Sequence, residues 1–308
     1  MKPCGSMSLS GEALKKYREA GRIAAEVRGE MRKYVKEGMP IIDVCETAES
    51  LIKELGGKPA FPCNVSINEI AAHYTSPPND EKTIPKGAIV KVDIGVHIDG
   101  YLTDTATTVC FNPQYRDMVR TAEEALHKGI EIIRDGLSTS KFGATIEKVV
   151  RERGFKPVSN LTGHMISRFL VHAGKSLPNV SHMFGFKLKK GQVFAIEPFV
   201  TEIDSVGKVR EGKIVTIFRF NKKKSLKDLY SKKLFSFIEK NFRTLPFCER
   251  WLKNVVPKQH FSKAFQNLLS SKCLFGYPIF IEASNKMVAQ AEHTVIIKEN
   301  GCEVLTEL

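Results

Sequence analysis

The segment KVDIGVHIDGYLTDTATTV, residues 91–109, constrains the fold more than any other part of this chain. β-Branched residues are dense on both sides of its centre, which is typical of β-strands. Asp99-Gly100 lies at the centre, and this dipeptide favours a two-residue turn because both positions adopt positive φ. We therefore predict an antiparallel hairpin in which Ile98 pairs with Tyr101.

Two aspartates share one face of the predicted hairpin. The register pairs Asp93 with Ala106, and Asp104 lies two residues away on the same face because side chains alternate along a strand. Their Cβ atoms would be diagonal neighbours, roughly 7–8 Å apart, which leaves room for two metal ions about 3.5–4 Å apart. A carboxylate in the apolar context Val-Asp-Ile is expected to be buried and to need a cation. We therefore prefer half of a dinuclear metal site over two surface aspartates.

The composition is that of a globular protein with a substantial core. Of 308 residues, 42% are hydrophobic and 26% charged, both ordinary values. No apolar run approaches the roughly 20 residues of a membrane span, and no signal peptide is evident. The seven cysteines are scattered without a CxxC pair, which favours a reducing cytosol over a disulfide framework or a zinc cluster. We expect a cytoplasmic protein with no membrane or DNA partner.

The sequence pattern of helices followed by strands occurs twice. Helices predicted over 12–36 and 40–55 precede an extended stretch and the hairpin, and helices over 113–134 and 140–153 precede a second extended stretch. This weak repeat predicts an α+β fold in which two related halves, each with a helix pair on its sheet, face each other across a cleft. An offset of 98 residues aligns these pairs: Gly38 with Gly136, Glu49 with Glu147, Gly56 with Gly154, Lys58 with Lys156, and Pro59 with Pro157.

A helical block interrupts the second half. Three short amphipathic helices are predicted there, and the second holds Pro246 in its first turn. We therefore divide the chain into a loose N-terminus (1–11), a main domain (12–223 and 276–308) and a helical insertion (224–275).

Basic residues concentrate where this block begins. The net charge is +13, and the run from Arg219 to Lys233 holds seven basic residues and one acidic residue. Such a run is compatible with a solvated face or with attraction to a polyanion, RNA above all. The sequence leaves both interpretations open.

Three further ionisable residues stand among strand-forming or glycine-rich neighbours. They are His164 in TGHMI, Glu197 in FAIEPF and Glu292 in AEHTVII. A lone histidine in such a context is more often structural, but a buried free carboxylate costs several kcal/mol (order of magnitude). With the two hairpin aspartates they supply four carboxylates and one imidazole, a set suited to two divalent ions of the Mn, Fe, Co or Zn group.

Five motifs resemble those of the methionine aminopeptidases: FPCNVSINEIAAHYT, VDIGVHIDGYLTDTA, GHMISRFLVHAG, AIEPF and AEHT. The resemblance runs from about residue 12 to 307. It implies the two-half pita-bread fold and removal of the N-terminal methionine from nascent polypeptides, with the ribosome as a candidate partner. The block 224–275 resembles the insertion of the type II enzymes. Because the long charged N-terminal extension of the eukaryotic enzymes is missing, we expect an archaeal-like minimal form.

The resemblance also implies a role for each candidate site residue. Five would be ligands of two divalent ions (Co, Mn, Fe or Zn): Asp93, Asp104, His164, Glu197 and Glu292. Asp104 and Glu292 would bridge the ions, with Asp93 completing one site and His164 and Glu197 the other. His73 would contact the substrate amide, His172 would stabilise the tetrahedral intermediate, and Glu197 would accept a proton. Four would line an apolar methionine pocket: Phe61, Val171, Phe199 and Tyr277.

One departure from the family pattern and two alternative functions remain. Ala291 stands where the family usually has Phe, which leaves the implied ligands intact and bears on rate or fit. An X-Pro aminopeptidase or creatinase-like hydrolase shares the fold and site, but usually carries a large N-terminal domain. A non-catalytic pita-bread protein that binds RNA or ribosomes would have lost ligands, whereas all five are present here.

Overall fold

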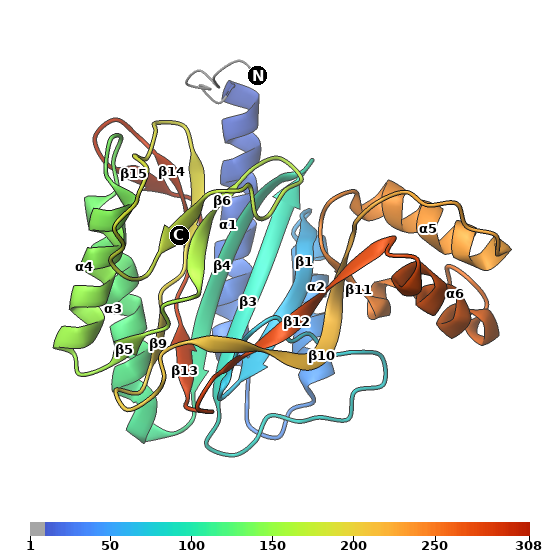
Figure 1. The fold of residues 1–308 in the computed structure, drawn as a ribbon, viewed down its shortest axis with the longest axis horizontal. Helices are drawn as coiled ribbons and strands as arrows, with labels where there is room; N and C mark the ends of the chain where they lie inside the picture. The colour runs from blue at the N-terminus through green and yellow to red at the C-terminus, as the bar shows by residue number, and fades with distance from the viewer. Residues whose placement is uncertain (1–9) are drawn as a thin grey trace.

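The chain folds into two helix-backed halves and a helical extension (Figure 1) in a computed structural model that describes residues 10–308. The first helix begins after Ser10, whose side chain caps it by accepting a hydrogen bond from the Ala13 amide. The remainder of the predicted loose N-terminus, residues 1–9, lies outside the described residues. Among residues 10–308, no helix combines the length and apolar character needed to cross a bilayer.

The first half places two helices behind a three-stranded antiparallel sheet of order β1-β3-β4 (Figure 1). The helices α1 (Gly11–Tyr34) and α2 (Ile41–Glu54) bury their apolar faces against this sheet in one continuous core. The strands are β1 (Lys58–Ile67), β3 (Ile89–Ile98) and β4 (Tyr101–Cys110).

The hairpin of β3 and β4 has the predicted register. Ile98 pairs with Tyr101 and Asp93 with Ala106, and both turn residues have positive φ, 50° at Asp99 and 85° at Gly100. Gly100 also meets the second half, because the Phe169 amide donates a hydrogen bond of 2.8 Å to its carbonyl. The Phe169 ring occupies the space that a Cβ at position 100 would need.

The second half repeats the arrangement of a helix pair on strands. α3 (Arg116–Ile132), preceded by the short η1 (Pro113–Tyr115), and α4 (Thr139–Glu152) share one core with two sheets, of order β13-β9-β5 and β15-β14-β8-β6-β7. All four helices predicted for the two halves are therefore present. The strands are β5 (Lys156–Pro157), β6 (Thr162–Ile166), β7 (Ser176–Pro178), β8 (Val193–Ile196), β9 (Phe199–Thr201), β13 (Val288–Gln290), β14 (His293–Ile297) and β15 (Cys302–Val304).

The two halves meet along a seam where β4 faces β13 and β14. Ala106 forms a β-bridge with Glu292, and the Thr105 hydroxyl donates to the Glu292 carbonyl at 2.7 Å. The Thr294 hydroxyl accepts from the Asp104 amide and donates to its carbonyl, both at 2.8 Å. Hydrogen bonds of side-chain hydroxyls thus join the two halves across the seam, as backbone hydrogen bonds join the strands within each sheet.

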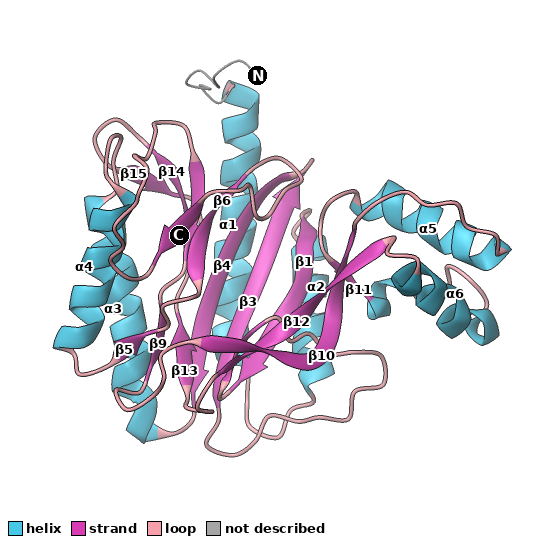
Figure 2. Cartoon of the chain, in the orientation of Figure 1, coloured by secondary structure: helices cyan, strands magenta, loops and turns pink. Residues whose placement is uncertain are grey.

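A fourth sheet, of order β11-β10-β12-β2, extends from the two halves towards two outlying helices (Figure 2). The helices α5 (Leu229–Phe242) and α6 (Lys258–Ser270) share an apolar cluster that is separate from the cores of the two halves. The strands are β2 (Ile70–Ala72), β10 (Val209–Phe220), β11 (Phe247–Cys248) and β12 (Leu274–Glu282). The division of the chain at 224 and 275 stays a prediction.

The prediction of a second helix in the insertion is wrong. After Pro246 the chain forms β11, in which Phe247 pairs with Phe218 and Cys248 with Ile217, and then a single 3₁₀ turn, η2 (Glu249–Leu252). Pairing with β10 occupies the backbone groups that a helix would use, a non-local gain that the helical spacing of apolar residues does not reveal.

Two glycines of α1 provide a matched test of how closely this helix packs. A Cβ at Gly21 would lie 2.1 Å from the Leu305 carbonyl oxygen, whereas one at Gly29 would meet nothing within 4 Å. We expect Gly29→Ala to raise the free energy of unfolding by about 0.5–1 kcal/mol. Gly21→Ala should lower it by about 1–3 kcal/mol through overpacking. Urea unfolding measures both, and equal gains would contradict the close contact between α1 and Leu305.

Candidate metal centre

Nearly all of the predicted site residues line one cavity of about 390 Å³. Glu292 is the exception, and it adjoins the cavity through Asp104 and His164. The cavity-lining members of the predicted set are Phe61, His73, Asp93, Asp104, His164, Val171, His172, Glu197, Phe199 and Tyr277. The structure therefore brings together residues that are more than two hundred positions apart in the sequence.

The five candidate ligands come from strands or strand ends of both halves. Asp93 lies on β3 and Asp104 on β4 of the first half, and His164 lies on β6 of the second. Glu197 occupies the break between β8 and β9, and Glu292 the break between β13 and β14. Each of the five is therefore fixed by a sheet or its immediate end.

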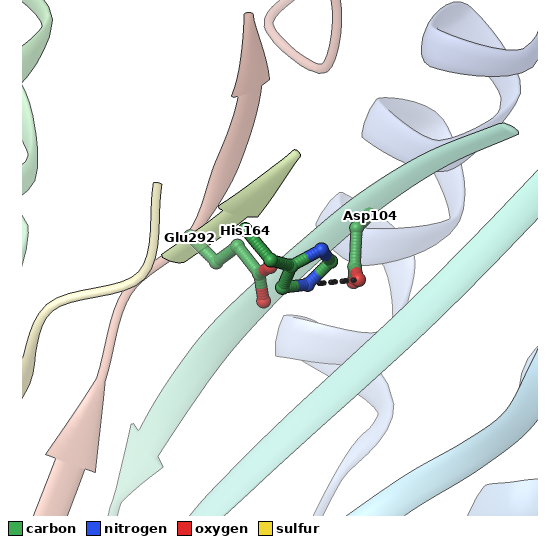
Figure 3. Close-up of side chains that lie close together, drawn as sticks. All are labelled: Asp104, His164 and Glu292. Atoms are coloured by element: carbon green, nitrogen blue, oxygen red, sulfur yellow. Dashed lines mark ion pairs between the residues drawn. The ribbon is translucent and has the colours of Figure 1, made fainter. Parts of the chain in front are cut away.

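The ligand atoms of Asp104, His164 and Glu292 lie within 4.8 Å of one another (Figure 3). His164 Nε2 is 3.5 Å from Asp104 Oδ2 and also 3.5 Å from Glu197 Oε1. The other ring nitrogen, Nδ1, is 2.8 Å from the Val171 carbonyl oxygen. Because a carbonyl only accepts, Nδ1 carries the hydrogen, and Nε2 presents its lone pair to the carboxylates as a metal ligand does.

Burial disfavours the ionised form of the four carboxyls unless a cation is present. It raises the pKa of Asp104 to about 7. It raises the pKa of Asp93, Glu197 and Glu292 well above the ordinary range, and mutual repulsion among the carboxylates adds to the rise. Within the described residues, Oδ1 of Asp93, Oδ1 of Asp104 and Oε1 of Glu292 have no hydrogen-bond partner. Buried oxygens without partners are costly, and this hard, oxygen-rich set fits divalent cations.

Gln290 belongs to the site and was missed in the sequence. Its side-chain Nε2 donates to Glu292 Oε2 at 3.1 Å and approaches Asp93 Oδ2 at 3.5 Å. The Thr108 hydroxyl fixes the Gln290 backbone. It donates a hydrogen bond to the Gln290 carbonyl at 2.6 Å and accepts one from the Gln290 backbone N–H at 3.0 Å. An amide two residues before Glu292 in an apolar strand was the available signal, because alternation puts both side chains on one face.

Ala291 points away from this face. It is 4% exposed and packs in the core that α3 and α4 share with the second half. The departure from the family pattern therefore concerns packing behind the sheet.

Two further histidines face the cavity from different halves. His73 follows β2 with φ of 68°, and its Nδ1 donates to the Pro278 carbonyl at 3.3 Å. The His172 ring centroid lies 4.4 Å from that of His164. Burial lowers the pKa of His73 to about 4 and that of His172 to about 3. Both imidazoles are therefore neutral near pH 7 and can donate or accept a hydrogen bond.

Comparison with known proteins places these features in a family. Residues 15–218 match metallopeptidase family M24. The methionine aminopeptidase of Methanocaldococcus jannaschii is 42% identical over 296 residues, covering 96% of this chain and 99% of the relative.

Two solved structures share the fold. A crystal structure of methionine aminopeptidase from Thermotoga maritima has a TM-score of 0.72 at 24% identity, covering 99% of this chain and 100% of that one. A structure of a thermophilic Arx1 has a TM-score of 0.82 at 21% identity, covering 98% of this chain and 92% of that one. The family match over residues 15–218 and the 42% identity to the archaeal relative show that the chain belongs to metallopeptidase family M24, among its methionine aminopeptidases.

Proposed function

We propose that this chain removes the N-terminal methionine from polypeptides by hydrolysis assisted by two divalent metal ions. The observation that carries the proposal is the group of four buried carboxyls and one imidazole, with oxygens that have no protein partner, beside an apolar cavity wall. The relatives named methionine aminopeptidase support the choice of substrate.

The proposed ligands are the five residues that converge at the cavity: Asp93, Asp104, His164, Glu197 and Glu292. Asp104 and Glu292, whose ligand atoms lie within 4.8 Å of each other and of His164, would be shared by the two ions. Gln290 orients Glu292 and Asp93 through its amide. Divalent ions of the Co, Mn, Fe or Zn group would acidify a water molecule and polarise the scissile carbonyl.

Each remaining polar group has a proposed task in the hydrolysis. Glu197 accepts the proton of the attacking water, a task suited to a carboxylate whose pKa burial raises. His172 donates a hydrogen bond to the oxygen that becomes negative in the tetrahedral intermediate. His73, which also lines the cavity, contacts the substrate amide.

The apolar wall of the cavity is the proposed binding site of the methionine side chain. Phe61 and Val171 belong to one buried cluster and Phe199 to another, and Tyr277 stacks edge-on against His73 with centroids 5.7 Å apart. An apolar slot suits an unbranched thioether, which adapts to irregular space.

Replacing Glu292 tests the metal centre. Glu292→Gln should lower turnover of Met-Ala-Ser by orders of magnitude, and elemental analysis should find fewer than two ions per chain. In metal-free protein the same change should raise the melting temperature, because ionised Glu292 is costly when buried. Its folded pKa lies above the ordinary 4.5, so that gain should widen as pH rises above 4.5. Glu54→Gln, at an exposed position of α2, is the control and should leave both turnover and metal content unchanged. Full turnover of Glu292→Gln would exclude the dinuclear site.

His172→Ala separates catalysis from metal binding. We expect kcat to fall by about 10²–10³-fold because a donor to the developing oxyanion is lost. Two ions should still bind, since His172 lies outside the proposed ligand set. Loss of an ion in this variant, seen by elemental analysis, would make His172 a ligand.

We further propose that nascent chains are met at the cytoplasmic ribosome, through the basic run 219–233. Its lysines are mostly exposed, although Lys223 pairs with Glu239 at 2.7 Å. Changing Lys222, Lys223 and Lys224 to Glu should reduce co-sedimentation with ribosomes at low salt, because fewer counterions are released on binding. Tripeptide turnover should stay unchanged, since exposed charges are largely screened beyond about 10 Å. Unaltered co-sedimentation would leave a solvated face as the explanation.

A further inference from the structure

Arg219 lies on the outward continuation of a wall of the cavity. Ile217, two residues earlier on β10 and on the same face, lines the cavity together with Tyr277. In the register of β10 with β12, Ile217 faces Tyr277 and Arg219 faces Phe275. One continuous strip therefore leads from the cavity at Ile217 and Tyr277 to Arg219 and Phe275 at its rim.

The Arg219 guanidinium is positioned by aromatic contacts and keeps free donors. Its central carbon lies 5.0 Å from the centroid of the Phe275 ring, which is 44% exposed and packs edge-on against Tyr277 at 5.3 Å. Nη1 donates to the Phe220 carbonyl at 3.3 Å. Among residues 10–308, no carboxylate oxygen lies within 4.0 Å of the guanidinium nitrogens. Because a guanidinium has five N–H donors in a planar fork, most of them remain available to a ligand.

The charge of Arg219 reaches the reacting part of the cavity. Burial is the main cause of the low pKa of His172, and the Arg219 charge lowers it further. Burial raises the pKa of the Tyr277 hydroxyl, and Arg219 partly opposes that rise. The guanidinium lies over Phe275, whose ring packs edge-on against the cavity-lining Tyr277, and it is outside the proposed metal centre.

We propose that Arg219 binds a carboxylate in the first few residues that follow the scissile bond, and so favours acidic substrates. This inference rests on the proposed peptidase function. Methionine fills the apolar slot, and the chain beyond it leaves past the rim, where the Arg219 guanidinium lies over the Phe275 ring. A planar fork matches a carboxylate with two parallel hydrogen bonds. The carboxylate belongs either to an Asp or Glu side chain or to the free C-terminus of a short peptide.

Paired peptides that differ by one charge test the proposal. In the amidated series Met-Ala-Ser-Ala-Ala, an Asp or its neutral isostere Asn is placed at the third, fourth or fifth residue. For the best position, we expect metal-loaded wild-type enzyme to favour Asp over Asn by about three- to tenfold in kcat/KM, mostly through KM. The preference should shrink at high salt. Comparing Met-Ala-Ser as free acid and as amide shows whether a C-terminal carboxylate is bound in the same way.

Three variants separate Arg219 from general charge effects. Arg219→Gln should bring the Asp-to-Asn ratio to about one while leaving the Asn peptide within about twofold of wild type. Arg219→Lys should retain part of the preference, because it keeps the charge without the planar fork. Lys240→Gln removes the same charge from an exposed position of α5, outside the basic run 219–233, and should keep the wild-type ratio.

The inference is overturned if wild type shows no carboxylate preference, or if Arg219→Gln keeps it in full. Calorimetry of the same peptide pairs measures the preference for Asp over Asn as a difference in binding affinity, independently of turnover. If metal-loaded wild type cleaves none of the peptides but still binds Asp peptides more tightly through Arg219, the proposed function fails and the carboxylate site stands.

Discussion

The seam between β4 and the pair β13–β14 is the contact on which the site depends. Among residues 10–308, backbone pairing there is reduced to the bridge between Ala106 and Glu292, and hydroxyls of Thr105, Thr108 and Thr294 supply further hydrogen bonds. These bonds hold Asp104 and Glu292 as diagonal neighbours across the seam, one from each half, with their ligand atoms within 4.8 Å of each other. The two proposed bridging ligands are therefore also the residues at which the halves are joined.

The same seam carries an electrostatic conflict that a cation would resolve. An unpaired buried charge costs several kcal/mol (order of magnitude), whereas a domain is stable by only about 5–15 kcal/mol in total. Four carboxyls whose pKa values burial raises lie close to this seam. Metal binding would therefore stabilise the junction of the halves as well as the chemistry, and apo and metal-loaded protein should differ in how firmly the halves are held together.

Sequence predicted those parts of the fold that are set locally. The hairpin register follows from Asp99-Gly100 because a two-residue turn determines which residues pair, and the carboxylates stood out because strand patterns give no reason for a charge there. The sequence did not predict contacts between residues that are far apart in the chain. Phe247 and Cys248 join β10 instead of forming a helix. The position of Gln290, two residues before Glu292, was a signal in the sequence, but its hydrogen bond to Glu292 is seen only in the structure. Arg219 was one member of a basic run until the pairing of β10 with β12 placed it over Phe275.

Gly100 ties the geometry of a turn to the placement of a histidine. Its positive φ closes the hairpin that carries Asp93 and Asp104, and its open side receives the Phe169 ring. Phe169 lies in the segment between β6 and His172, and its amide donates a hydrogen bond to the Gly100 carbonyl. A side chain at position 100 would therefore disturb the turn of one half and displace the loop of the other. Remodelling this turn would therefore also move the segment that places His172 at the cavity.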